Sequence, residues 1–495
     1  MVWKFAYKLV TGTPDIRRNA DLEFDRPLTR PQPPRPREVS VALCSAIAKA
    51  PRMSVTSAPK EEANLVRAVG VPGLTANIIN TTVGAGIFVL PASVALLMGP
   101  AAPLAFLICA FVMGLVVASF ALAGSRVSVS GGLYGYVETA FGRSMGFLAG
   151  ALLFVNACLG VSSVGTAFAG FVGTAFPIVA NRPGKIALLA TVFLFLAAIN
   201  IRGVKSGVGV VGTVTIAKMI PLLLYVIIGI HSINPDLVAW HGWPSPRKLG
   251  ESVVLLVFAF SGVEVALTPS GEVKNPAKTV PRSLLGALSL ITVLYVAIQV
   301  VTQGVLGNDI ANFKNAPLAE AGSRFLGNGG GVLILTGAII SSFGFVASDM
   351  LGSPRTLFAL SQLGVLPAIF SRIHPRFHTP HYAILGYAAI TFLLALSSTF
   401  EHLVILSSIP LLLLYLLACI AAVTLIRRDV SLAGNPLRFP GAFLVPIGAA
   451  LAVTWILIEA IKSVWAETSL NEVGLIGLLV VAGALLFIFR RNSLK

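Results

Sequence analysis

Two short runs of small residues interrupt long apolar stretches of this sequence. The first is Gly84-Ala85-Gly86, and the second runs from Phe258 to Gly262. In hydrocarbon every backbone N–H and C=O must be satisfied, and an unpaired group costs on the order of several kcal/mol. A helix break inside a membrane is therefore tolerated where the freed groups line a cavity or meet a ligand.

An interrupted helix offers both kinds of group that a zwitterion needs. Its N-terminal end faces the gap with a partial positive charge that suits a carboxylate, and its carbonyl end suits an ammonium. Glycine lets a ligand approach the backbone closely. The alternative is a small-residue packing face between helices. The second break, five apolar stretches further along the chain, favours a binding site.

Lys218 is the only lysine or arginine well inside an apolar stretch. It lies 11 residues beyond Gly207, which on a helix is about 16 Å and close to the middle of a bilayer. Burial there favours the neutral amine over the ammonium, so this lysine is a candidate proton-coupling group. The alternative is a permanently charged structural lysine that donates to carbonyls of the first break. Both interpretations place Lys218 against that break.

Glu264 follows the second break by two residues. Its carboxylate would either line a pathway or cap backbone that the break sets free, and the sequence leaves both interpretations open. Enzymatic motifs are missing: the chain has no HExxH and no P-loop, and it has no GxSxG in a suitable context. Its four cysteines form no CxxC or Cys/His cluster, so we expect no metal site and no cofactor.

The stretches around these residues predict a membrane protein. Of the 495 residues, 56% are hydrophobic and 11% are charged, whereas soluble domains carry about 25% charged residues. A membrane span needs roughly 20 predominantly apolar residues. Twelve stretches qualify: 71–98, 101–124, 144–175, 184–201, 207–231, 250–271, 284–306, 329–357, 381–399, 402–426, 442–463 and 473–490.

The net charge of +16 is explained by topology rather than by nucleic acid. With the N-terminus inside, the loops beyond the tail carry 16 lysines and arginines on the cytoplasmic side and 7 outside. This bias predicts a multi-pass protein of the inner (cytoplasmic) membrane with both termini in the cytoplasm. Residues 1–69 are predicted to be a disordered, basic cytoplasmic tail. Met53 is an alternative start, which leaves open whether residues 1–52 belong to the mature protein.

Breaks at corresponding places in two halves predict an inverted repeat. The transporter domain would span residues 70–491, with repeat one at 70–231 and repeat two at 249–428. The last two spans, within 442–491, would be an addition to the two repeats. The fold class is therefore an all-α membrane protein of about twelve transmembrane helices, with helices one and six broken.

The sequence resembles the amino acid–polyamine–organocation superfamily, in its bacterial amino acid permease branch. The resemblance covers about residues 65–490, and four stretches carry it in order and spacing: Val83-Gly84-Ala85-Gly86-Ile87-Phe88, Asn200-Ile201-Arg202-Gly203-Val204-Lys205-Ser206-Gly207, Phe258 to Glu264 leading to Gly271-Glu272-Val273-Lys274-Asn275-Pro276, and Gly352-Ser353-Pro354-Arg355.

The resemblance implies roles for individual residues. The N–H groups of Gly84, Ala85 and Gly86 would hold a substrate carboxylate. The position of Lys218 resembles that of a lysine in proton-coupled members. The carbonyls that would hold the amine belong to Thr82, Phe258, Ala259 and Ser261.

The function that these features imply is proton-coupled symport of an amino acid. Span three contains no acidic residue, so a second positive charge on the substrate would lack a partner there, which favours a neutral amino acid. Two alternatives stay open: an amino acid or polyamine exchanger of the same fold, and a non-transporting sensor. The expected partners are a small amino acid, a proton and the lipid bilayer. The sequence leaves the oligomeric state, the stoichiometry and the transported amino acid open.

Overall fold

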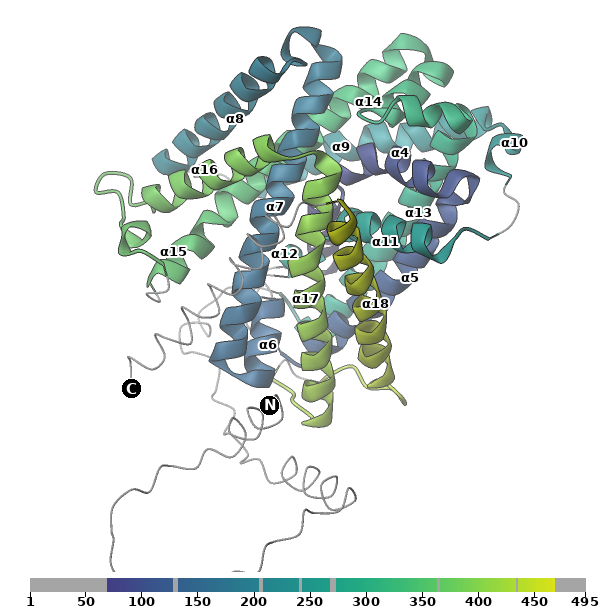
Figure 1. Cartoon of the computed structure of the whole chain (residues 1–495). Coiled ribbons are helices and arrows are strands. Elements are labelled where there is room, and N and C mark those ends of the chain that lie inside the picture. Colours follow the sequence, from purple (N-terminus) through teal and green to yellow (C-terminus); the bar gives the residue numbers. More distant parts are fainter. Residues whose placement is uncertain are drawn as a thin grey trace, which may run out of the picture. The chain divides into compact units, whose positions relative to one another are not determined.

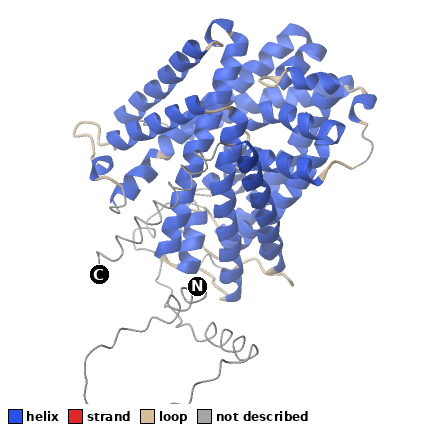
Figure 2. Cartoon of the chain, in the orientation of Figure 1, coloured by secondary structure: helices blue, strands red, loops and turns tan. Residues whose placement is uncertain are grey.

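Helices make up almost all of the described part of the chain (Figures 1 and 2). The structure is a computed structural model that describes residues 69–127, 132–203, 208–239, 243–267, 273–362, 366–432 and 435–467. Its longer helices are α3 (Val71–Thr82), α4 (Gly86–Met98), α5 (Ala102–Gly124), α6 (Leu133–Phe141), α7 (Arg143–Ala175), α8 (Arg182–Arg202), α9 (Val208–Gly229), α11 (Pro246–Phe260), α13 (Pro276–Leu306), α14 (Pro317–Gly352), α15 (Pro354–Gln362), α16 (His381–Ser397), α17 (Phe400–Arg427) and α18 (Leu444–Glu467).

These helices confirm the predicted all-α membrane fold. Each of the predicted spans between residues 71 and 463 contains a helix, and no named strand occurs in the described ranges. Eight helical stretches there are long and apolar enough to cross a membrane, and two shorter apolar helices accompany them. The predicted span 473–490, most of the predicted tail and the Gly271-Glu272 part of the family motif lie outside the described residues.

Helices one and six are broken where the sequence predicts. Helix one consists of α3 and α4, and residues 83–85 between them are not helical. Helix six consists of α11 and the single turn α12 (Val263–Ala266), with Ser261 extended and Gly262 in the left-handed region at φ +106°. A positive φ favours glycine, so Gly262 allows the backbone to leave the helical conformation between α11 and α12.

The unbroken helices hold the broken ones in place. α13 packs against α3 and α5, α14 packs against α7 and α9, and α17 lies between α7 and α18. α7 and α17 run side by side as long helices in Figure 1. Large apolar side chains such as Phe111, Val293 and Leu451 are about 70% exposed, as expected of surfaces that face lipid.

One short backbone link joins the segment before helix one to the segment that follows helix six. The N–H of Lys274 donates to the carbonyl of Val69 over 2.8 Å, so the segment before α3 pairs with the segment before α13. Asn77 on α3 also donates to the carbonyl of Ala266 on α12. The first segment of helix one and the second segment of helix six are therefore tied together on the side that the charge bias predicts to be cytoplasmic.

Candidate functional site

The two breaks lie directly against each other, although about 180 residues separate them in the sequence. A Cβ on Gly262 would lie 2.5 Å from the carbonyl oxygen of Thr81. On the other side, a Cβ on Gly86 would lie 3.3 Å from the Cα of Ala259. At both points the nearest atom is a backbone atom. A side chain at Gly86 or Gly262 would crowd it, so glycine at these two positions permits the close contact.

The first break leaves backbone donors without backbone acceptors. Within the described ranges, the N–H groups of Ala85 and Ile87 form no backbone hydrogen bond. The N–H of Gly84 donates to the carbonyl of Thr82 over 2.9 Å. Of the predicted carboxylate ligands, Ala85 therefore offers a free donor at the start of α4, whereas Gly84 would have to exchange an existing bond.

Three of the four predicted amine-binding carbonyls, those of Thr82, Phe258 and Ala259, already accept hydrogen bonds. The hydroxyl of Tyr295 on α13 donates to the carbonyls of Thr82 and Ala259, over 3.2 Å each. The carbonyl of Phe258 accepts from the hydroxyl of Ser261 over 2.7 Å. Each carbonyl oxygen has two lone pairs, so an incoming ammonium would share or displace these donors. Sequence reasoning missed Tyr295, a single tyrosine inside an apolar span.

Lys218 lies against the first break. Its Nζ donates to the carbonyl of Asn80 over 2.5 Å and to that of Val83 over 2.7 Å. The side chain is 2% exposed, and the hydroxyl of Ser341 on α14 also donates to the carbonyl of Val83. The lysine thus satisfies carbonyls that the end of α3 sets free.

Glu264 forms hydrogen bonds at the second break. Both of its carboxylate oxygens lie 3.0 Å from the N–H of Gly262, which donates to them. The hydroxyl of Tyr415 on α17 donates to Oε2 over 2.7 Å, and the glutamate is 3% exposed. This arrangement is that of a cap on freed backbone, one of the two interpretations that the sequence left open.

Substitution of Glu264 separates capping from a pathway role. Glu264→Ala leaves a buried N–H and a buried hydroxyl unpaired, at about 1–3 kcal/mol each, so the apparent melting temperature in detergent should fall steeply. Glu264→Gln keeps an acceptor for Gly262 and should retain most of the stability and of the transport rate. A Glu264→Gln protein that is fully stable but transports nothing would instead support the pathway role.

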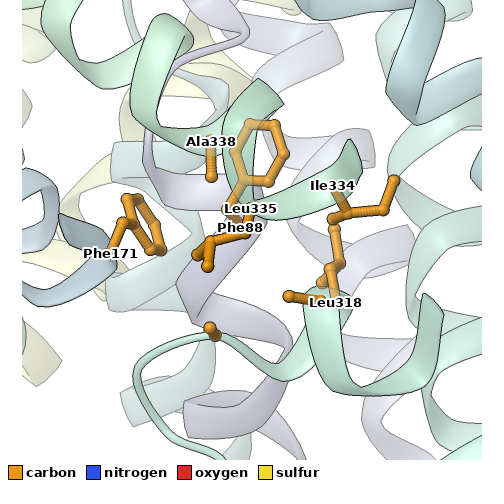
Figure 3. A pocket seen from close by; sticks show the side chains of 8 residues that line it. Phe88, Phe171, Leu318, Ile334, Leu335 and Ala338 are labelled. Carbon is orange, nitrogen blue, oxygen red and sulfur yellow. The ribbon is translucent and has the colours of Figure 1, made fainter. Parts of the chain in front are cut away.

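Aromatic side chains close the space around the breaks. Phe258 packs edge-on against Phe400 at the start of α17, with 6.0 Å between ring centroids. Beyond the break, a narrow and wholly apolar gap separates α4, α7 and α14 (Figure 3). Phe88 of α4 and Phe171 of α7 face each other across it, with ring centroids 6.3 Å apart. Apolar side chains therefore line the side of the first break that faces α7 and α14.

Comparison with known proteins places the whole arrangement in context. A family model described as amino acid permease matches residues 69–487. The chain is 29% identical to the serine/threonine exchanger SteT of Bacillus subtilis over 380 residues, which cover 74% of the chain and 85% of that protein. It is 26% identical to the branched-chain amino acid permease BcaP of the same organism over 436 residues, 83% of the chain and 90% of that protein. It is also 29% identical to the methylthioribose transporter of that organism over 349 residues, 66% of the chain and 74% of that protein.

Proposed function

The chain belongs to the amino acid permease family, and from this membership we propose that it moves a neutral amino acid across the cytoplasmic membrane by alternating access. The observation that carries the proposal is the meeting of two broken helices beside Lys218. The start of α4, with its backbone donors, and the end of α11, with its carbonyls, meet at this contact, which supplies both kinds of group that a zwitterion needs.

We propose that Lys218 couples transport to protons. In the protonated state, Nζ binds the carbonyls of Asn80 and Val83 and holds the end of α3 in place. Loss of the proton weakens these charge-assisted bonds and allows the break to change shape. This mechanism makes one proton a requirement for one of the conformations of the cycle, as alternating access with symport demands.

The preference for a neutral substrate rests on two features of the structure and on the names of two relatives. α7, which faces the breaks through Gly160, carries no acidic side chain that would pair with a second substrate cation. Glu264 is occupied by Gly262 and Tyr415. Two of the relatives above are named for serine, threonine or branched-chain amino acids. Their side chains are uncharged.

Ligand-induced thermal stabilisation tests the binding part of the proposal. The purified full-length chain is heated with each common amino acid, and with polyamines, in detergent. A neutral L-amino acid at 100 times its dissociation constant should stabilise the protein by about 2.7 kcal/mol. Its amide and its N-acetyl derivative, which lack one of the two charges, should have little effect. Equal stabilisation by these derivatives would argue against a zwitterion site.

Gly84→Leu tests the carboxylate half of the site. A Cβ on Gly84 would lie 3.6 Å from the ring of Phe345, so alanine fits and a leucine side chain does not. We expect Gly84→Leu to lower substrate affinity by about tenfold or more, and Gly84→Ala, the matched control, to bind much as the unaltered protein does. Unchanged affinity in the leucine variant would remove Gly84 from the site.

Exchange is the second candidate function, because one relative is named a serine/threonine exchanger. In that case Lys218 would be structural and permanently charged. Flux into liposomes distinguishes the two functions. A symporter accumulates substrate in empty liposomes when a proton gradient is imposed. Uptake that does not depend on the gradient and requires substrate inside the liposomes would show that the protein is an exchanger rather than a symporter.

A protein that binds an amino acid but transports none in either assay would be a sensor.

A further inference from the structure

A second polar site lies far from the breaks, at the end of the bundle where α5 and α17 finish and α18 begins. It is a cavity of about 300 Å³. The residues that line it are Arg126, Ile426, Asp429, Arg438, Phe439, Gly441, Ala442 and Phe443. None of these residues takes part in the contacts between the broken helices, so the proposed transport mechanism does not explain the cavity.

Arg126 is the unusual group in this cavity. Its side chain is 3% exposed, and its Nη1 donates to the carbonyls of Leu122 and Leu437. Its Nε is buried and has no hydrogen-bond partner among the described residues, and its Nη2 forms no hydrogen bond there either. A buried donor without an acceptor is costly, so this edge of the guanidinium calls for an acceptor. The Nε–Nη2 edge is a fork of two parallel N–H donors, which suits the oxygens of a phosphate.

The charges around the cavity favour an anion. Arg438 and Asp429 form an exposed ion pair, in which Nη2 lies 3.0 Å from both carboxylate oxygens. This pair is neutral, so Arg126 leaves the cavity with one net positive charge. Burial holds the pKa of Arg126 below its usual value. The nearby carboxylate of Asp429 opposes this shift, and the charge of Arg438 adds to it. An anion in the cavity would supply the missing compensation.

The walls of the cavity are apolar and continue onto the outer surface of the bundle. Phe439 and Phe443 are each 44% exposed, and Leu444, the first residue of α18, is 59% exposed. The cavity thus combines a cationic donor edge with apolar side chains at the end of membrane helices. The positive-loop bias assigns this end to the cytoplasmic leaflet, where anionic lipids concentrate basic groups.

We propose that this cavity binds the phosphate of an anionic phospholipid of the adjoining leaflet, with Arg126 as its bidentate ligand. Arg438 would stay paired with Asp429 and so cancel the negative charge of that carboxylate beside the phosphate. The acyl chains would lie along Phe439, Phe443 and the start of α18. Free inorganic phosphate shares the charged chemistry, but it would leave the apolar walls unused. Occupancy would tie the ends of α5, α17 and α18 together.

Lipid titration of the purified full-length protein tests this site. Apparent melting temperature in a mild detergent is measured against short-chain phosphatidylglycerol, short-chain phosphatidylcholine and inorganic phosphate. Phosphatidylglycerol should raise it in a saturable manner, and the other two should not. Arg438→Gln, at an exposed position, should weaken the phosphatidylglycerol effect about tenfold or more, because it leaves Asp429 unpaired beside the cavity. Arg126→Lys, which keeps the charge but loses the fork, should also weaken it.

Arg247→Gln is the matched control. Arg247 is equally an exposed arginine in an ion pair, with Glu251 at 2.8 Å, but it lies at the start of α11 on the opposite end of the bundle. The control should respond to phosphatidylglycerol as the unaltered protein does. An Arg438→Gln protein that also does so would exclude the cavity as the site, whatever the stability of the Arg126 variant. Equal stabilisation by inorganic phosphate would show that the ligand is a soluble anion and overturn the lipid assignment.

Discussion

Lys218→Ala should abolish proton-driven accumulation of substrate while leaving the protein folded and able to bind. The side chain contributes two hydrogen bonds, from Nζ to the carbonyls of Asn80 and Val83, and both end at the first break. Alanine removes them together with the only cation in contact with this break in the described part of the chain. We expect at least about a tenfold loss of uptake driven by a pH gradient, measured in proteoliposomes.

The pH profile of the remaining transport decides between the two roles of Lys218. If Nζ exchanges a proton during the cycle, counterflow of labelled substrate by Lys218→Ala should continue and lose its dependence on pH. If Lys218 is only structural, affinity and stability should fall, but the pH profile of whatever transport remains should keep its shape. Lys248→Ala, which removes an exposed lysine near the start of α11, controls for the loss of one positive charge.

The sequence predicted the parts of this site that depend on local composition. The two breaks follow from runs of small residues within apolar stretches. Residues 83–85 and 261–262 are non-helical, whereas Gly86 and residues 258–260 of the predicted breaks belong to helices. The depth of Lys218 follows from its distance from the end of its span. The regularity of a helix makes both inferences possible, because rise per residue converts sequence distance into membrane depth.

The contacts between helices were beyond sequence reasoning for a physical reason. A helix that is apolar on all sides carries no stripe that fixes which face turns toward its neighbours. Neither Tyr295, which bridges the two breaks, nor Tyr415, which supports Glu264, could therefore be assigned from its own span. Both are tyrosines buried to 0% exposure, and a buried hydroxyl needs a partner. That requirement was the available signal, but it names no partner.

Gly262→Ala should disrupt the site more than any other single methyl group. Gly262 has φ +106°, and a side chain in the left-handed region costs about 1–2 kcal/mol. The added Cβ would also lie 2.5 Å from the carbonyl oxygen of Thr81 and 2.7 Å from its carbonyl carbon. These are backbone atoms of α3, so no side-chain rotation relieves the overlap, and the two broken helices have to move apart. Such overpacking costs about 1–3 kcal/mol more.

A glycine at the end of the other broken helix separates the two contributions. Gly99, at the end of α4, also has a positive φ, +58°, but a Cβ there would meet nothing within 4 Å. Gly99→Ala should therefore cost only the backbone term and leave substrate affinity unchanged. Gly262→Ala should lower the apparent melting temperature further and reduce affinity about tenfold or more, because the carbonyls of α11 shift away from the start of α4. Equal melting temperatures and affinities in the two variants would mean that the breaks do not need this close contact, and the site would then have to lie elsewhere.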